Sequence, residues 1–263
     1  MELHTFSTHV IALAQRVADF IATEYRNFDT ERIEVKSTNS LVSYVDKEAE
    51  QTIVAELRRL LPEAGFIAEE GTGSPQPEGY NWIIDPLDGT TNFVHGIPTF
   101  SVSIALTDAE ENILIGVVHE VMREETFHAV AGGGAFLNGQ RISVSKATRL
   151  SEGLVATGFP YASFERVDEY FQLLRKFMKG SHGLRRIGSA AVDLAYVACG
   201  RFDAFFEYGL NPWDVAAGIL LVREAGGSVT NFAGTPQCLN GQQILASCPG
   251  VRGEVEAIIQ EGW

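Results

Sequence analysis

The sequence predicts an α/β (α+β) fold in which layers of helix and sheet stack on one another. Three observations lead to this prediction. Two amphipathic segments come first, a series of short apolar strands follows, and strands then alternate with helices. The length of 263 residues suits one large domain or two closely packed lobes with a sizeable core.

The two opening segments are predicted to be helices because their apolar residues recur at helical spacing. The first covers about residues 7–26. The second includes residues 53–61 and ends at Pro62, which cannot continue a helix.

Several runs rich in β-branched residues come next. They are FIAEE (66–70), NWIID (81–85), FSVSIALTD (100–108), ILIGVVHEV (113–121) and ETFHAVAG (125–132). Short polar connections join them with no helix between, which favours an antiparallel sheet. Asn138-Gly139 then separates two further apolar runs and predicts a hairpin turn.

The second half predicts alternating strands and helices. Strands are expected at 154–159, 202–208, 228–232 and 242–247, and helices at 165–178, 188–200, from 211–214 to 226–227, and at the end of the chain. Near residues 147–152 the pattern changes from successive strands to strands that alternate with helices. This change predicts two lobes, 1–150 and 151–263, packed as one globular unit.

Composition narrows the partners and the compartment. A formal net charge of −14 disfavours nucleic acid, since a phosphate polyanion would be repelled. Three cysteines without metal-ligand spacing predict free thiols in a reducing cytoplasm. No secretory signal and no membrane span is expected from the sequence. A small phosphorylated substrate would also be repelled unless cations are bound where it lands.

The stretch WIIDPLDGTTN (82–92) places two carboxylates at the end of an apolar strand. Pro86 fixes the backbone, so that Asp85, Asp88 and the Leu87 carbonyl can converge as hard oxygen donors for Mg²⁺. Gly89 and the N–H groups that follow it suit a phosphate. An Asx turn with a helix cap would satisfy the same residues without any ligand.

Three further acidic positions are candidates for the same cleft. Glu69-Glu70 ends a neighbouring strand, although adjacent carboxylates there are also typical of a solvated loop. Asp214 opens an almost wholly apolar helix and is either its N-cap or a buried carboxylate facing a polar group. Asp46 carries the same ambiguity and is closer to an ordinary cap.

Taken together, these motifs resemble the signatures of the inositol monophosphatase family. The resemblance rests on Asp85 to Asn92, the upstream Glu69-Glu70 and the segment WDVAAG (213–218), in the family's order and spacing. Similarity of helix and strand pattern extends over nearly the whole chain. Around Gly158-Phe159-Pro160 the sequence departs from the animal enzymes and looks bacterial in type.

The resemblance implies a layered α-β-α-β-α sandwich, usually homodimeric, that hydrolyses phosphate monoesters with two or three Mg²⁺ ions and is often inhibited by lithium. By position, the resemblance also implies a role for each candidate residue.

The metal ligands would be Glu69, Asp85, the Leu87 carbonyl, Asp88 and Asp214. Gly89 and Thr90 would hold the phosphate, and Asp46 and Thr90 would orient the attacking water near Glu69. The rest of the substrate would meet Asp88, Ala190, Glu207 and Asp214, and Lys36 would lie near the cleft.

Bound Mg²⁺ would convert an acidic cleft into an anion receptor and activate a water for in-line displacement, with no covalent phosphoenzyme. Inositol monophosphate is the expected substrate. Fructose 1,6-bisphosphate, histidinol phosphate and 3′-phosphoadenosine nucleotides stay open as alternatives. A regulatory protein that keeps this fold and binds partners such as the transcription machinery is the alternative from another functional class.

Overall fold

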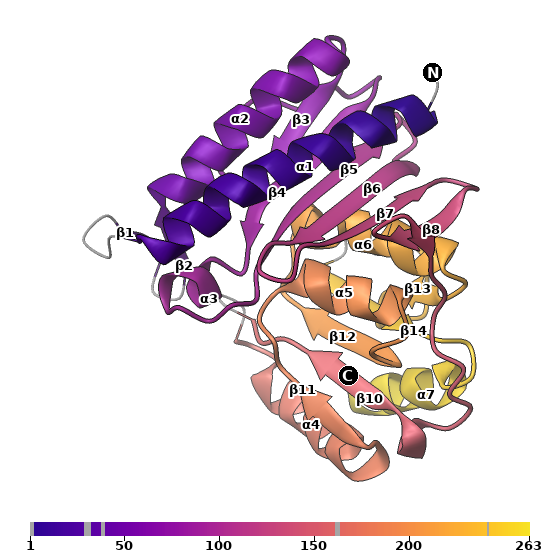
Figure 1. The fold of residues 1–263 in the computed structure, drawn as a ribbon. Helices are drawn as coiled ribbons and strands as arrows, with labels where there is room; N and C mark the ends of the chain where they lie inside the picture. Colours follow the sequence, from indigo (N-terminus) through magenta and orange to yellow (C-terminus); the bar gives the residue numbers. More distant parts are fainter. Residues whose placement is uncertain (1–2, 29–32, 38–39, 161–163, 241) are drawn as a thin grey trace.

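The computed structural model describes residues 3–28, 33–37, 40–160, 164–240 and 242–263. Two large sheets and the helices around them stack in five layers, which confirms the predicted α/β layering (Figure 1). Helices α1 (Leu3–Arg26) and α2 (Tyr44–Leu60) form the first layer. Their apolar faces bury the outer side of the first sheet, because long amphipathic helices need such a surface.

The first sheet has seven strands in sequence order. They are β3 (Gly65–Ala68), β4 (Asn81–Asp88), β5 (Ser101–Thr107), β6 (Ile113–Glu120), β7 (Glu125–Val130), β8 (Gly134–Leu137) and β9 (Gln140–Arg141). All neighbours from β4 onward pair antiparallel, as predicted. The β3–β4 pair is parallel, so the prediction was wrong at this edge. The segment 69–80 is long enough to return the chain to the starting end of the sheet.

Alternation along β4 explains why its run is apolar on both faces. Trp82 and Ile84 pack with the α1 and α2 side chains, whereas Ile83 belongs to the core between the sheets. A strand covered on both sides reads as a continuous apolar run. The polar residues at its end therefore lie at a buried edge.

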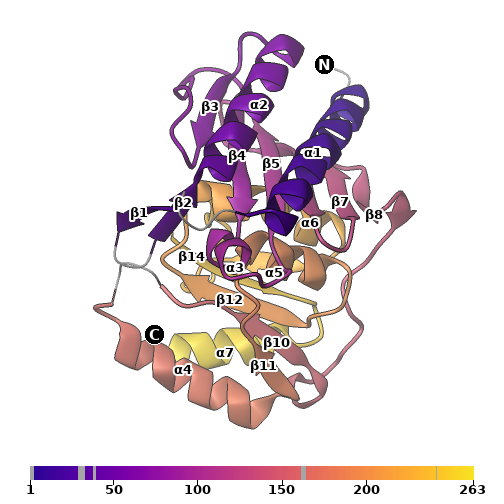
Figure 2. The same ribbon diagram turned by 60° about the vertical axis from the view of Figure 1, so that its left-hand side comes forward.

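The second sheet has five strands in the order β11-β10-β12-β14-β13. They are β10 (Leu154–Thr157), β11 (Gly183–Arg185), β12 (Ala204–Tyr208), β13 (Ser228–Thr230) and β14 (Gln243–Ser247). The short strand β11 was not predicted, since GLR has no strand pattern of its own. Helices α4 (Val167–Gly180) and α7 (Arg252–Gly262) lie side by side beneath this sheet (Figure 2).

Helices α5 (Ala190–Ala198) and α6 (Pro212–Glu224) form the layer between the two sheets (Figures 1 and 2). Both are almost wholly buried, which explains why α6 is apolar all round. Contacts described below bring both helix N-termini to the carboxyl end of β4. That meeting point is the candidate site.

Smaller features complete the fold. Asn138 and Gly139 have positive φ and connect β8 to β9, which confirms the predicted hairpin. A hairpin of β1 (Ile33–Ser37) and β2 (Ser40–Ser43) precedes α2 and was not predicted. The first sheet ends at Arg141 and the second begins at Leu154, but the two-lobe division stays a prediction. Within the described ranges, no helix combines the length and apolar character needed to cross a membrane.

Candidate metal and phosphate site

The end of β4 departs from regular pairing where the two aspartates lie. Its register with β5 shifts between Asp85 and Asp88, and Pro86 occupies the irregular stretch, where no ladder N–H is needed. Asp85 Oδ1 accepts a hydrogen bond from Leu87 N at 2.9 Å. Both aspartates are buried, with 2% and 9% of their surface exposed. The irregular backbone at the end of β4 thus directs both carboxylates to the same side.

Asp214 joins them from the first turn of α6. The N-cap of this helix is Asn211, and Asp214 is the third residue of a capping box, accepting from Asn211 N at 2.7 Å. It therefore both stabilises the helix start and contributes a carboxylate to the cleft. Asp85, Asp88 and Asp214 each offer an oxygen, and these three oxygens lie within 4.8 Å of one another.

Burial and mutual repulsion make this cluster costly when no cation is present. Desolvation raises the pKa of Asp85 well above its usual value, and the charges of Glu69, Asp88 and Asp214 raise it further. Desolvation likewise raises the pKa of Asp214, followed by the charge of Asp88. Like charges held together at a buried site favour either protonation or a bound cation.

Asp88 is held by the N-terminal end of α5. Its Oδ2 accepts from Ser189 Oγ at 2.6 Å and from Ala191 N at 2.7 Å. Desolvation raises its pKa to about 6, and the bonds from Ser189, Ala191 and Ala190 limit the rise. Ser189 is itself the N-cap of α5. Sequence reasoning missed Ser189, although Gly-Ser-Ala-Ala before an apolar run is an N-cap signal.

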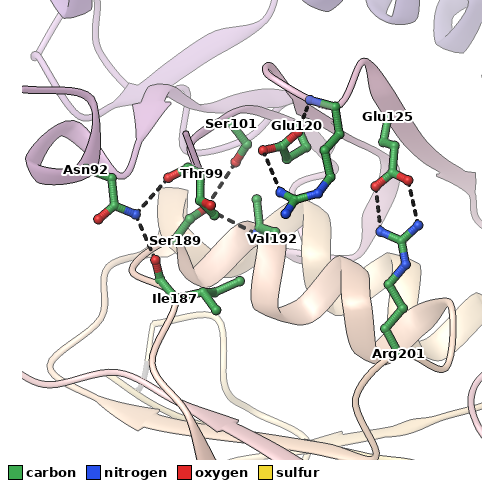
Figure 3. Close-up of polar contacts among 10 residues, drawn as sticks. Asn92, Thr99, Ser101, Glu120, Glu125, Ile187, Ser189, Val192 and Arg201 are labelled. Carbon is green, nitrogen blue, oxygen red and sulfur yellow. Dashed lines mark hydrogen bonds and ion pairs between the residues drawn. The ribbon is translucent and has the colours of Figure 1, made fainter. Parts of the chain in front are cut away.

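The far end of α5 is fixed as well. Figure 3 shows Arg201, just beyond α5, in a two-pronged ion pair with Glu125 on β7. The same view shows Ser101 beside Ser189 at the start of the helix, with the two hydroxyl oxygens 3.3 Å apart. Helix α5 is thus tied to the first sheet at both ends, which fixes the donors that hold Asp88.

Glu69 lies in the turn that follows β3 and is half-buried. It lies near the cluster, because its charge raises the pKa of both Asp85 and Asp214. The turn is held by Glu50 of α2, whose carboxylate accepts from Glu70 N at 2.7 Å and Thr72 N at 2.8 Å. Glu50 is fully buried and was also missed; it lies four residues after Asp46, on the same helix face.

Gly89 links β4 to the short helix α3 (Thr90–Val94) in a left-handed conformation, with φ of 99°. A Cβ at this position would lie 3.1 Å from Thr99 O and 3.2 Å from Gly188 O. Conformation and space therefore both require glycine here. The chain passes close to the carboxylates before turning into α3.

Thr90 and Asp46 form a pair beside this turn. Thr90 Oγ1 lies 2.8 Å from Asp46 Oδ1 and 3.0 Å from the Leu87 carbonyl oxygen. The N-cap of α2 is Ser43, and Asp46 is the third residue of its capping box, accepting from Ser43 N at 2.8 Å. Asp46 therefore uses one oxygen as a cap and the other toward Thr90.

Asn92 connects α3 to the chain before α5. Its Nδ2 donates to Thr99 O at 2.8 Å and to Ile187 O at 2.7 Å (Figure 3). The side chain is buried. One amide group thus joins the turn after β4 to the segment that carries Ser189.

The remaining expected substrate residues lie on the second half of the chain. Ala190 is the first residue of α5, directly before the Ala191 N–H that binds Asp88. Glu207 on β12 is buried, and the charges of Asp214 and Asp88 add to a pKa that burial has already raised. Both residues therefore lie near Asp88. Lys36 is part of β1, and its side chain falls outside the described part of the structure.

The donor set fits a hard divalent cation. Carboxylate and carbonyl oxygens are the ligands that Mg²⁺ prefers, and Asp85, Asp88 and Asp214 present them within reach of one ion. Burial raises the pKa of all three carboxylates although hydrogen bonds lower each of these pKa values and the charge of Arg186 lowers that of Asp88, so these groups offset the cost of burial only in part. The cluster therefore fits a divalent cation beside a glycine turn.

Comparison with known proteins identifies the family. The family model described as the inositol monophosphatase family matches residues 2–261. "Nus factor SuhB" of Pseudomonas aeruginosa is 43% identical over 238 residues, covering 89% of this chain and 88% of that protein. "Inositol-1-monophosphatase" of Mesorhizobium japonicum is 39% identical, covering 90% and 89%. The crystal structure of the extragenic suppressor protein suhB from Bartonella henselae superposes with a TM-score of 0.91 at 38% identity, covering 97% and 98%. The chain belongs to the inositol monophosphatase family.

Proposed function

We propose that the protein hydrolyses a phosphate monoester with Mg²⁺, and that inositol monophosphate is the substrate. The observation that carries this proposal is the cluster of buried Asp85 and Asp88 with half-buried Asp214, whose oxygens lie within 4.8 Å of one another beside the Gly89 turn. Phosphate and a carboxylate cluster can share one cleft only when a cation lies between them.

The metal ligands we propose are Glu69, Asp85, the Leu87 carbonyl, Asp88 and Asp214, holding two or three Mg²⁺ ions. When bound, these ions would neutralise phosphate charge and make an attacking water more acidic. The backbone N–H groups of Gly89 and Thr90 would hold phosphate oxygens from the side opposite Glu69.

Orientation of the water is assigned to Thr90 and Asp46. The Thr90 proton points to Asp46 Oδ1 or the Leu87 carbonyl, so its oxygen lone pairs are left to accept a hydrogen bond from water. Glu69, whose charge acts on Asp85 and Asp214, would accept the proton that the water loses.

The alcohol part of the substrate would meet Ala190 and Glu207, and Asp88 and Asp214 would border the same space. A buried carboxylate such as Glu207 would accept hydrogen bonds from hydroxyl groups, which supports a polyol phosphate as substrate. The similar protein from Mesorhizobium japonicum carries the name inositol-1-monophosphatase, which supports this choice. Lithium sensitivity, a homodimer, a cytoplasmic location and the absence of a nucleic-acid partner stay predictions.

Phosphate release tests the proposal. The purified protein would be freed of metal with chelator and assayed with and without Mg²⁺ on inositol 1-phosphate, fructose 1,6-bisphosphate, histidinol phosphate and a 3′-phosphoadenosine nucleotide. We expect Mg²⁺-dependent turnover, highest on inositol 1-phosphate, and its loss in Asp88→Asn. Asp19→Asn, an exposed change on α1, is the matched control. Full turnover in chelator would contradict the metal assignment.

A second role as a Nus factor is a separate proposal. It is supported by the relatives named Nus factor SuhB, such as that of Pseudomonas aeruginosa at 43% identity. An intact carboxylate cluster does not exclude such a role. Complementation of a strain lacking its own Nus factor SuhB, by wild type and by Asp88→Asn, would separate it from catalysis. Complementation by both would assign a role independent of phosphate release, and failure of both would remove this candidate.

A further inference from the structure

Strand β5 presents small side chains, three of them with a hydroxyl group, to the helix layer between the two sheets. Its even-numbered residues are apolar and pack with the α1 and α2 side chains, as Ile104 does. Side chains alternate between the two faces of a strand, so the inward positions are Ser101, Ser103, Ala105 and Thr107. All four are buried, with at most 3% of their surface exposed. Hydroxyl groups buried in this layer need hydrogen-bond partners.

Ser101 reaches the N-terminal end of α5. Its hydroxyl oxygen lies 3.3 Å from that of Ser189, which in turn donates to Asp88 Oδ2 at 2.6 Å (Figure 3). Because the single Ser189 proton is used on Asp88, Ser101 is the donor in the contact between the two serines. Ser189 Oγ also accepts from Val192 N at 3.3 Å, so both of its lone pairs are used. The Ser189 hydroxyl is thus held in one orientation, with its proton on the Asp88 carboxylate.

Ser103 reaches the N-terminal end of α6 in the same manner. Its Oγ donates to the Trp213 carbonyl oxygen at 3.3 Å, and Trp213 directly precedes Asp214 in the first turn of the helix. Helix α6 approaches the neighbouring strand β6 so closely that a Cβ on Gly116 would lie 2.8 Å from the Ala217 carbonyl oxygen. Small residues therefore let the α6 backbone lie against the sheet, and the Ser103 hydroxyl binds its first turn.

Both serines pair with proposed metal ligands of β4. In the β4–β5 ladder, Ser101 is the partner of Asp88 and Ser103 is the partner of Asp85. Their spacing of two residues places the two hydroxyl groups on one face of β5. One pair of strands therefore carries two carboxylates of the cluster together with the hydroxyl groups that bind the N-terminal ends of α5 and α6.

We infer that Ser101 and Ser103 are positioning residues of the proposed metal site and help to set its affinity for Mg²⁺. Ser101 acts on Asp88 through the Ser189 hydroxyl. Ser103 acts on Asp214 through the main chain of the first turn of α6. The inference rests on the proposed function and deepens it, because groups that hold the ligands fix their orientation before an ion binds.

Calorimetric titration of the chelator-treated protein with Mg²⁺ alone tests the inference without any substrate. Ser101→Ala and Ser103→Ala each remove one hydroxyl group and leave the ligands in place. Each should raise the Kd for Mg²⁺ about 3- to 10-fold, the size expected for one hydrogen bond. Ser189→Ala removes the direct donor to Asp88 and should raise the Kd more, about 10- to 100-fold.

A double variant tests whether Ser101 acts through Ser189. If it does, Ser101→Ala combined with Ser189→Ala should have the same Kd for Mg²⁺ as Ser189→Ala alone. A further 3- to 10-fold loss of affinity in the double variant would overturn this route, since the effect of Ser101 would then be independent of Ser189.

Thr107→Val is the matched control. Thr107 lies on the same face of β5, and its hydroxyl donates to a backbone carbonyl at the same distance of 3.3 Å, but this carbonyl belongs to Asn81 at the opposite end of β4. The variant should lower the melting temperature of the metal-free protein about as much as Ser103→Ala and leave the Kd for Mg²⁺ unchanged. A Kd that rises equally in Thr107→Val, or stays at the wild-type value in both serine variants, would overturn the inference. A wild-type protein that binds no Mg²⁺ would instead refute the metal site itself, and with it the proposed function.

Discussion

The Thr90 hydroxyl lies 2.8 Å from a carboxylate oxygen of Asp46, and the two residues are 44 positions apart in the sequence. One comes from the turn after β4 and the other from the first turn of α2. Because Asp46 is also bonded to Ser43 N, it cannot follow Thr90 if the turn moves. Substitution of Thr90 therefore tests whether this pair takes part in orienting the attacking water.

Thr90→Val should lower kcat by about two or more decades, because loss of acid–base assistance commonly costs about 10²–10⁴-fold. Valine has nearly the same shape, so KM should change much less. Thr90→Ser keeps the hydroxyl and serves as the matched control, with kcat within about tenfold of wild type. Steady-state phosphate release gives both constants. A valine variant that melts earlier but keeps its kcat would show that the pair only stabilises the fold.

The pH dependence of stability should depend on the metal cluster. In the metal-free protein burial raises the pKa of Asp88 from 3.8 to about 6, so the folded state binds the proton more tightly than the unfolded chain. The contribution of Asp88 to the free energy of unfolding is therefore fully present below about pH 4 and is lost as the pH rises through about 6. Asp85 and Asp214 are shifted in the same direction.

Asp88→Asn removes this titration. In chelator, the melting temperature of the variant should therefore rise relative to that of wild type as the pH increases from about 4 to about 7. Added Mg²⁺ should raise the melting temperature of wild type more at the upper end of this range than at the lower, because protons compete for the ligands. Differential scanning fluorimetry follows both effects. A constant difference between wild type and variant across this pH range would contradict the assignment.

The sequence predicted those parts of the site that lie next to one another in the chain. Asp85, Asp88 and Gly89 were expected at a strand end from one short motif, and the structure has them there. It did not reveal Ser189 or Glu50, because each acts on a carboxylate or a turn at least 20 positions away. Hydrogen bonds between residues so far apart in the sequence depend on how the helix and sheet layers pack together. The spacing of apolar residues within one segment does not predict that packing.

The fold divides in the same way. Long helices and buried strands were predicted because their apolar periodicity is strong, whereas the parallel β3–β4 pair and the short strand β11 were missed. Strand direction at a sheet edge depends on the path of the connecting loop, and three residues are too few to show a period. For Asp46 and Asp214 the sequence left open whether each caps a helix or faces the site. Both are the N3 residue of a capping box. In addition, Asp46 accepts from Thr90, and Asp214 offers an oxygen to the carboxylate cluster.

Asn92→Asp should destabilise the protein strongly. The buried Nδ2 serves two carbonyls, and a carboxylate oxygen in its place would leave both unpaired and add a charge. Two unsatisfied buried acceptors cost about 2–6 kcal/mol, and each kcal/mol lowers the melting temperature of a protein of this size by about 2–4 °C. Asn27→Asp is the control, since Asn27 is exposed and its Nδ2 donates to one carbonyl, that of Thr23, among the described residues. Equal losses in both variants would show that Asn92 does not join the two segments.

Glu50→Gln tests whether the turn that carries Glu69 must be held in place. The Glu50 carboxylate accepts from two backbone N–H groups, Glu70 N and Thr72 N, each through a different oxygen. Glutamine keeps one acceptor but presents an NH₂ group to the other N–H, so one of the two bonds must break. We expect a loss of about 1–3 kcal/mol in the free energy of unfolding, the cost of one buried unsatisfied group.

The same substitution should lower kcat, because Glu69 would no longer be fixed beside Asp85 and Asp214. The hydrogen bonds of Glu50 go to the backbone N–H groups of Glu70 and Thr72, so a kinetic effect is expected to pass through the turn. Glu48→Gln, an exposed change on the same helix, is the control and should leave both stability and kcat unaltered. Urea unfolding and steady-state kinetics measure the two effects. If Glu50→Gln loses stability while kcat at saturating Mg²⁺ stays at the wild-type value, Glu69 does not depend on this turn, and its proposed place beside the attacking water would have to be abandoned.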